Sequence, residues 1–195
     1  AEGQPGSRRE PSTAAVHFRT LPEPPPQPHA CGEPMTMEVL MTRDDGSGKS
    51  RHDRWFLGTS MRFHATGAGT GGALSVVEQL MPAGFSPPRH VHANEAGVIV
   101  VLEGELTVEV GDEQRTLRAS ESAFLPRGVP HTFRARVPSR ILEVTTPGGI
   151  DAFYDENAVP AEHAGLPEPT PPDLRRLAET ARRRQVEIVG PPLEG

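Results

Sequence analysis

The sequence predicts an all-β domain, a β-barrel or a sandwich of short strands, set between two proline-rich segments. The chain has 22 Pro and 20 Gly among 195 residues, about 22% against a typical 12%, so long helices cannot dominate the fold. In the central part of the chain, apolar residues either alternate with polar ones or form short β-branched runs. These runs are separated by Pro and Gly, as is typical of many short strands joined by turns.

The strands are expected in chain order from these patterns. A two-residue hairpin turn is predicted at Gly111-Asp112, because residues 106 to 110 alternate and a second strand-like run follows at once. The sequence contains no internal duplication, which favours one barrel over two. The predicted strands are Leu74–Met81, Val98–Leu102, Leu106–Val110, Glu113–Leu117, Ala123–Leu125, Thr132–Arg136 and Ile141–Thr145.

The two ends of the chain differ from its centre in proline content. Eight prolines lie in residues 1–34 and seven in residues 160–195, so we expect a partly disordered arm at 1–34, a barrel at 35–159 and a C-terminal extension at 160–195. The extension holds one predicted short helix that packs on the barrel. Asp173 is placed to cap this helix, and apolar residues follow it at helical spacing: Leu174, Leu177, Ala178 and Ala181.

Charge and composition exclude several function classes. The net charge is −6 and no basic cluster is interleaved with aromatic residues, which argues against a nucleic-acid partner. The longest apolar run, 98–102, is far too short to span a bilayer, so no membrane helix is expected. Cys31 is the single cysteine, which excludes an internal disulfide and agrees with a cytoplasmic location.

Three of the eight histidines form a candidate metal site. His90 and His92 stand two residues apart, and in a strand such a spacing puts both imidazoles on one face. His131 follows the turn sequence Pro126-Arg127-Gly128-Val129-Pro130 about forty residues later. Two imidazoles from one strand and a third from a neighbouring strand can face one point inside a barrel. Such a site binds a divalent transition metal (Fe, Mn, Ni, Co, Cu or Zn) and leaves coordination positions open.

These residues carry a resemblance to a known family. Gly84-x5-His90-x-His92, then Leu102-Glu103-Gly104-Glu105-Leu106, and later Pro126-x-Gly128-x2-His131 resemble the two motifs of the cupin superfamily. Together with Trp55-Phe56-Leu57-Gly58 and Glu187-Ile188-Val189-Gly190, they resemble bacterial single-domain cupins described as quercetin-dioxygenase-like, over about residues 53–192. The resemblance implies a double-stranded β-helix, or jelly roll, with metal ligands at His90, His92 and His131.

One position departs from the family pattern. The metal-binding Glu common in such cupins falls on Gly97, where no carboxylate stands. Three hypotheses follow: a three-His metal site, a site in which Glu95 replaces the missing ligand or catalytic base, and a degenerate site without a functional metal. In the third case the cavity would bind an organic ligand.

The resemblance also implies a function. We expect an enzyme that acts on a small, largely apolar organic substrate, phenolic or polyketide-like, by dioxygenase-like chemistry; a cyclase or isomerase using the same cavity is an alternative. A cupin that binds a ligand without turnover is the rival from another class. By the same resemblance, the protein is expected to form a homodimer.

Overall fold

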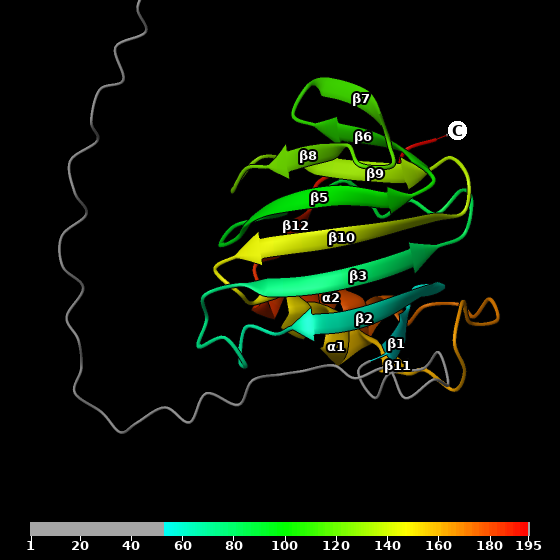
Figure 1. The fold of residues 1–195 in the computed structure, drawn as a ribbon. Coiled ribbons are helices and arrows are strands. Elements are labelled where there is room, and N and C mark those ends of the chain that lie inside the picture. Colours follow the sequence, from blue (N-terminus) through cyan, green and yellow to red (C-terminus); the bar gives the residue numbers. More distant parts are fainter. Residues whose placement is uncertain (1–52, 195) are drawn as a thin grey trace, which may run out of the picture. The chain divides into compact units, whose positions relative to one another are not determined.

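The computed structural model describes residues 53–194, which form two antiparallel sheets and two short helices (Figure 1). The large sheet has the strand order β11-β1-β2-β3-β10-β5-β8, and the small sheet has the order β12-β4-β9-β6-β7. The strands are β1 (Asp53–Phe56), β2 (Thr59–Ala65), β3 (Ser75–Met81), β4 (His90–His92), β5 (Ala96–Glu103), β6 (Glu105–Val110), β7 (Glu113–Arg118), β8 (Ser122–Leu125), β9 (His131–Ala135), β10 (Ser139–Thr146), β11 (Val159–Pro160) and β12 (Val186–Ile188); the helices are α1 (Ile150–Asn157) and α2 (Leu174–Arg183). The prediction of an all-β fold with a short C-terminal helix is confirmed.

Alternation along the central strands decides which side chains face the barrel interior. In β3 every second residue from Ser75 to Met81 is buried, and β10 shows the same pattern from Ser139 to Thr145. β10 pairs with β3 on one side and with β5 on the other. Because successive side chains in a strand point to opposite faces, these three strands present one continuous inner wall.

The barrel interior divides into two apolar clusters. One lies between β5, β6, β9 and neighbouring strands and contains Met81, Ile99, Val101, Leu106, Val108, Leu117, Leu125, Phe133, Ala135 and Ile141. The other lies under the helices and contains Phe56, Met61, Phe63, Val77, Ile150, Phe153, Leu177, Ala181 and Val186. Residues of both clusters line the cavity at the candidate metal site.

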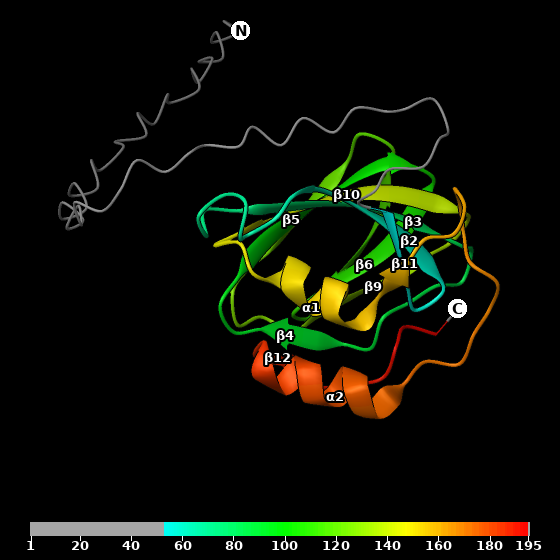
Figure 2. The same cartoon turned by 90° about the horizontal axis from the view of Figure 1, so that it is seen from below.

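The C-terminal part of the chain completes the small sheet. Asp173 caps α2 by accepting a hydrogen bond from the Arg176 backbone N–H at 3.0 Å, as the sequence predicts. α2 packs beside α1 and buries Leu177, which contributes roughly 2 kcal/mol of apolar burial. The chain then forms β12, which pairs with β4. Figure 2 shows α1 between the large sheet and β4, with α2 next to β12.

Five elements have no counterpart among the predicted strands and helix: β1, β2, α1, β11 and β12. In β2, Met61 and Phe63 alternate with polar residues, which is the signal by which this strand could have been found. α1 is only eight residues long, and β11 and β12 are two and three residues long. Segments this short bury too few side chains to show a clear periodicity. The β-branched residues Val186 and Ile188 are the signal by which β12 could have been found.

Gly104 allows the chain to cross from one sheet to the other. It joins β5 of the large sheet to β6 of the small sheet with a φ of +88°, a conformation that favours glycine. A Cβ at this position would lie 2.7 Å from the carbonyl oxygen of Pro138, so no larger residue fits without displacing backbone. The Gly111-Asp112 turn joins Val110 to Glu113 in the two-residue hairpin that the sequence predicts.

The predicted arm at 1–34 and the first part of the predicted barrel, 35–52, lie outside the described residues. The domain boundaries drawn at 35 and 160 stay predictions. Neither helix of the described chain has the length and apolar character needed to cross a membrane.

Candidate metal centre

The three histidines come from two paired strands of the small sheet. His90 and His92 lie at the two ends of β4, and His131 begins β9. β4 and β9 are antiparallel neighbours in which His90 stands directly opposite His131. This arrangement agrees with the expectation that two imidazoles share a strand face and a third comes from a neighbouring strand.

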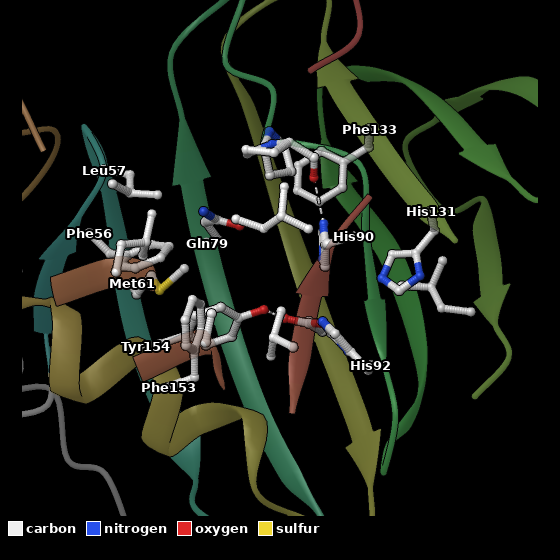
Figure 3. Close-up of a pocket in the computed structure, with 18 of the residues that line it drawn as sticks. Phe56, Leu57, Met61, Gln79, His90, His92, His131, Phe133, Phe153 and Tyr154 are labelled. Atoms are coloured by element: carbon white, nitrogen blue, oxygen red, sulfur yellow. Dashed lines mark hydrogen bonds between the residues drawn. The ribbon is translucent and has the colours of Figure 1, made fainter. Parts of the chain in front are cut away.

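The three imidazoles form a compact triangle. The ring centroids are 5.0 Å apart for His90 and His92, 4.6 Å for His90 and His131, and 4.9 Å for His92 and His131. One potential ligand nitrogen of each residue lies within 4.8 Å of the others. Figure 3 shows the three rings gathered on one side of a cavity, opposite Phe56, Met61 and Phe153. The group is therefore close enough to hold one metal ion.

Backbone carbonyls orient two of the rings. His90 Nδ1 lies 2.7 Å from the carbonyl oxygen of Pro88, and His131 Nδ1 lies 2.9 Å from that of Val129. A neutral ring that donates from Nδ1 keeps its lone pair on Nε2, the form in which imidazole binds a metal. The Nε2 atoms of His92 and His131 are buried and have no hydrogen-bond partner among the described residues. Unpartnered buried nitrogens are what a bound metal would satisfy, so these residues fit a metal ion.

Burial keeps the three rings neutral. Burial, together with positive charge on neighbouring imidazoles, lowers the pKa of His90 to about 4 and that of His92 to about 2. Burial lowers the pKa of His131 as well. Since the neutral form is the ligand form, the site is ready to bind a metal at neutral pH.

The cavity in front of the histidines is mainly apolar. No Lys or Arg is among its described lining residues, and Glu143 is its single carboxylate. The walls come from both sheets and both helices: Phe56, Leu57, Met61, Gln79, Phe85, Pro87, Pro88, Ile99, Leu125, Phe133, Phe153, Tyr154, Leu177, Ala181, Val186 and Ile188. A ligand whose affinity depended on a carboxylate or phosphate group would find no cationic side chain here.

Glu95 is not among the residues that line the cavity in front of the histidines. Its side chain is buried, with 6% exposed, but it belongs to a second pocket together with Asn94, Arg127 and Gly149. A Cβ on Gly149 would lie 2.8 Å from Glu95 Oε1, which places the carboxylate against the start of α1. The geometry gives no support to Glu95 as a ligand or base, a role that only a variant can test.

Gly97 lies on the inner side of β5, where the family pattern has its carboxylate. A Cβ here would lie 3.3 Å from Thr145 Cγ2 and 3.5 Å from the carbonyl oxygen of Val144. The space is tight for any side chain. Among the described residues, the group of potential metal ligands at this site consists of histidines alone.

Sequence reasoning missed the carboxylate that does face the cavity. Glu143 lies on β10, and its side chain is 9% exposed. Its Oε2 accepts a hydrogen bond of 2.8 Å from the hydroxyl of Tyr154 on α1. Burial raises the pKa of Glu143 to about 7 against the opposing hydrogen bond from Tyr154, and the negative charge of Glu95 adds to the rise. The available signal was the alternation of Ile141, Glu143 and Thr145, which puts a charged residue on a buried strand face.

Comparison with known proteins finds similarity to cupins. The model of the cupin domain family matches residues 76–145, which include all three histidines. Quercetin 2,3-dioxygenase of Bacillus subtilis (strain 168) is 29% identical over 120 residues, which are 60% of this chain and 36% of the relative. The chain thus spans about a third of the length of the curated relative that it matches.

Solved structures with a similar fold include KdgF from Halomonas sp., with a TM-score of 0.47 and 22% identity over 52% of this chain and 93% of that one. An RmlC-like cupin from Shewanella frigidimarina has a TM-score of 0.45 and 23% identity over 49% of this chain and 82% of that one. Residues 76–145 thus match a cupin domain, and the two-sheet barrel with its histidine triangle agrees with this match.

Proposed function

We propose that the protein is a metal-dependent enzyme acting on a small, uncharged, phenolic or polyketide-like substrate. The observation that carries this proposal is the convergence of three neutral imidazoles, two of them with unpartnered buried Nε2 atoms, at an apolar cavity without cationic lining residues. The similarity to quercetin 2,3-dioxygenase supports dioxygenase-like chemistry.

The residues of this site have different roles. His90, His92 and His131 would hold the ion, and two backbone carbonyls orient the His90 and His131 rings. A divalent metal bound by three nitrogens supplies Lewis acidity and open coordination positions. The aromatic and aliphatic walls, including Phe56, Phe153 and Phe133, contact the apolar body of the substrate and exclude water.

Metal content tests the first part of this proposal. Protein purified without a metal-chelating tag should contain about one transition-metal ion per chain, as expected for a single three-ligand site. His90→Ala should abolish binding, whereas His163→Ala, which changes an exposed histidine on the C-terminal segment, should not. Sub-stoichiometric metal that is the same in all three proteins would overturn the metal site.

A second candidate function is favoured by the absence of a carboxylate at Gly97. In this case the cavity binds a small ligand without turnover, or serves a cyclase or isomerase. Incubation of metal-loaded protein with a flavonol under air separates these candidates. Consumption of dioxygen together with the flavonol supports a dioxygenase, and binding without consumption of either supports one of the alternatives.

The homodimer and the cytoplasmic location that the sequence favours stay predictions. Sedimentation equilibrium of the full chain tests the first, with a mass of about twice 21.0 kDa expected. Fractionation of the source cells tests the second.

A further inference from the structure

Glu143 occupies an unusual place for a carboxylate. It lies on the inner face of β10, opposite Val77 on β3 and Ile99 on β5. Both neighbours are buried apolar residues. A carboxylate in such surroundings costs free energy unless it is hydrogen-bonded or serves a function.

The other buried carboxylates near the site have different surroundings. Asp151 accepts a hydrogen bond of 3.1 Å from the Gly67 backbone N–H, and Glu95 lies in the second pocket. Among the described residues, Glu143 is therefore the carboxylate that shares a cavity with the three histidines.

Tyr154 on α1 donates a hydrogen bond to the Glu143 carboxylate. Figure 3 shows the Tyr154 side chain directed from α1 toward the histidine side of the cavity, and a dashed line marks its hydrogen bond to the carboxylate. Burial, and then the negative charge of Glu143, raise the pKa of Tyr154 well above its ordinary value, so its hydroxyl stays a donor. Among the hydrogen bonds of the described residues, none reaches Glu143 Oε1, which leaves this oxygen available to a ligand.

The position of Glu143 is also related to that of Gly97. On the same inner face, Gly97 pairs with Thr145 and Ile99 pairs with Glu143. Gly97 and Glu143 are thus diagonal neighbours on adjacent strands, a relation in which Cα atoms are roughly 7–8 Å apart and long side chains reach the same space. β10 therefore offers a carboxylate to the region that β5 leaves without one.

We propose that Glu143, held in place by Tyr154, accepts the proton of a substrate hydroxyl in this cavity. The inference rests on the proposed function and adds the group that ionises the substrate. In the step, the O–H bond of an enol or phenol breaks, its electron pair stays on the substrate oxygen, and the proton forms a new O–H bond at Glu143 Oε1. The Tyr154 hydroxyl remains bound to Oε2 throughout.

This assignment narrows the substrate class. A cavity with one proton acceptor, neutral imidazoles and no cationic lining residue suits a molecule that is uncharged on entry and carries a weakly acidic hydroxyl. A proton acceptor works best when its pKa is near the working pH, and burial brings the pKa of Glu143 into this range.

Infrared difference spectroscopy tests the proton transfer directly. Zinc-loaded protein is mixed with quercetin without dioxygen, in a buffer above the pKa of Glu143. The wild type should gain the band of one protonated carboxyl group on binding, while the visible spectrum of quercetin shifts to that of its anion. Glu143→Gln should lose the infrared band.

Two further variants complete the test. Glu78→Gln makes the same substitution on the outer face of the neighbouring strand β3 and should keep the band. Tyr154→Phe should keep the band but shift it, because one hydrogen bond to the carboxyl group is gone; this variant also serves if Glu143→Gln does not fold.

The outcomes separate this inference from the proposed function. A wild type that binds neither zinc nor quercetin contradicts the proposed function, and the inference falls with it. A wild type that binds both without gaining the band, a band that persists in Glu143→Gln, or a band that Tyr154→Phe leaves unshifted overturns the role of Glu143 while the metal site stands.

Discussion

The cavity has two polar walls that respond to burial in opposite ways. On the wall formed by β4 and β9, burial lowers the pKa of each imidazole, so His90, His92 and His131 are neutral. On the wall formed by β10 and α1, burial raises the pKa of Glu143 to about 7. In both cases the low-polarity interior disfavours charge.

The same physical cause therefore produces two different chemical abilities. A neutral imidazole offers a lone pair to a metal, and a carboxylate of raised pKa binds a proton more readily. The difference predicts opposite effects of ligand, pH and substitution on the two walls, and the following experiments test it in order of expected effect.

The largest effect is expected from metal binding to the histidine wall. At a free metal concentration about 1,000 times the dissociation constant, a bound ion stabilises the folded state by about 4 kcal/mol. Addition of a chelator should lower the melting temperature of the wild type, because it removes this contribution. His131→Ala should melt at the same temperature with and without metal, and a persistent difference would place the ion at another site.

The second effect is a change in the stability of the fold with pH, caused by the ionisation of Glu143. Its pKa is 4.5 ordinarily and about 7 in the fold, a difference that corresponds to on the order of 3 kcal/mol. The contribution of the protonated carboxyl group to the free energy of unfolding is fully present below pH 4.5, where the group is protonated in both the folded and the unfolded state. It is lost as the pH rises through about 7. Glu143→Gln cannot ionise, so urea unfolding should show it gaining stability relative to the wild type over this interval.

Glu78→Gln provides the matched control for this pH dependence. Burial raises the pKa of Glu78, but hydrogen bonds from His64 and Arg140 outweigh burial and leave this pKa lowered. A lowered carboxyl pKa stabilises the fold above the ordinary value of 4.5. The Glu78→Gln variant should therefore lose stability relative to the wild type as the pH rises, and an equal trend in both variants would contradict the comparison.

The third effect comes from the hydrogen bond between the carboxylate and α1. Tyr154→Phe removes the donor to Glu143 Oε2, and a hydrogen bond to a charged group contributes roughly 1.5–3 kcal/mol. We expect a loss of stability of this size above pH 7 and a smaller loss in acid, where the carboxyl group is neutral. Chemical denaturation at both pH values measures the difference; equal losses would mean that Tyr154 acts only through packing.

The smallest effect is expected at Glu95. Because its carboxylate lies in the second pocket with Arg127 and Gly149, Glu95→Gln should leave metal content and quercetin binding unchanged. Metal analysis and a binding titration measure both. A loss of either would show that Glu95 moves into the cavity in solution and would restore it as a candidate ligand or base.

Local sequence patterns predicted the elements whose formation depends on nearby residues. The hairpin of β6 and β7 follows from alternation on both sides of Gly111-Asp112, and α2 follows from the Asp173 cap and the spacing of Leu177 and Ala181. α1 and β12 were not predicted because each is short and is stabilised by residues distant in sequence. α1 packs in the apolar cluster under the helices, and β12 pairs with β4.

By itself, the sequence determined the histidine wall. His90 and His92 alternate in a strand, which puts their rings on one face. The motif resemblance adds His131, and the pairing of β4 with β9 sets it opposite His90. The sequence also shows that Gly97 stands where the resembling family has a carboxylate.

Only the tertiary structure decided which carboxylate faces the histidines. Glu95 is close to them in sequence but lies against the start of α1, whereas Glu143 is about fifty residues from His92 and shares their cavity. The physical reason is that the pairing of β10 with β5 and the packing of α1 set the position of Glu143 and Tyr154, and neither depends on chain spacing.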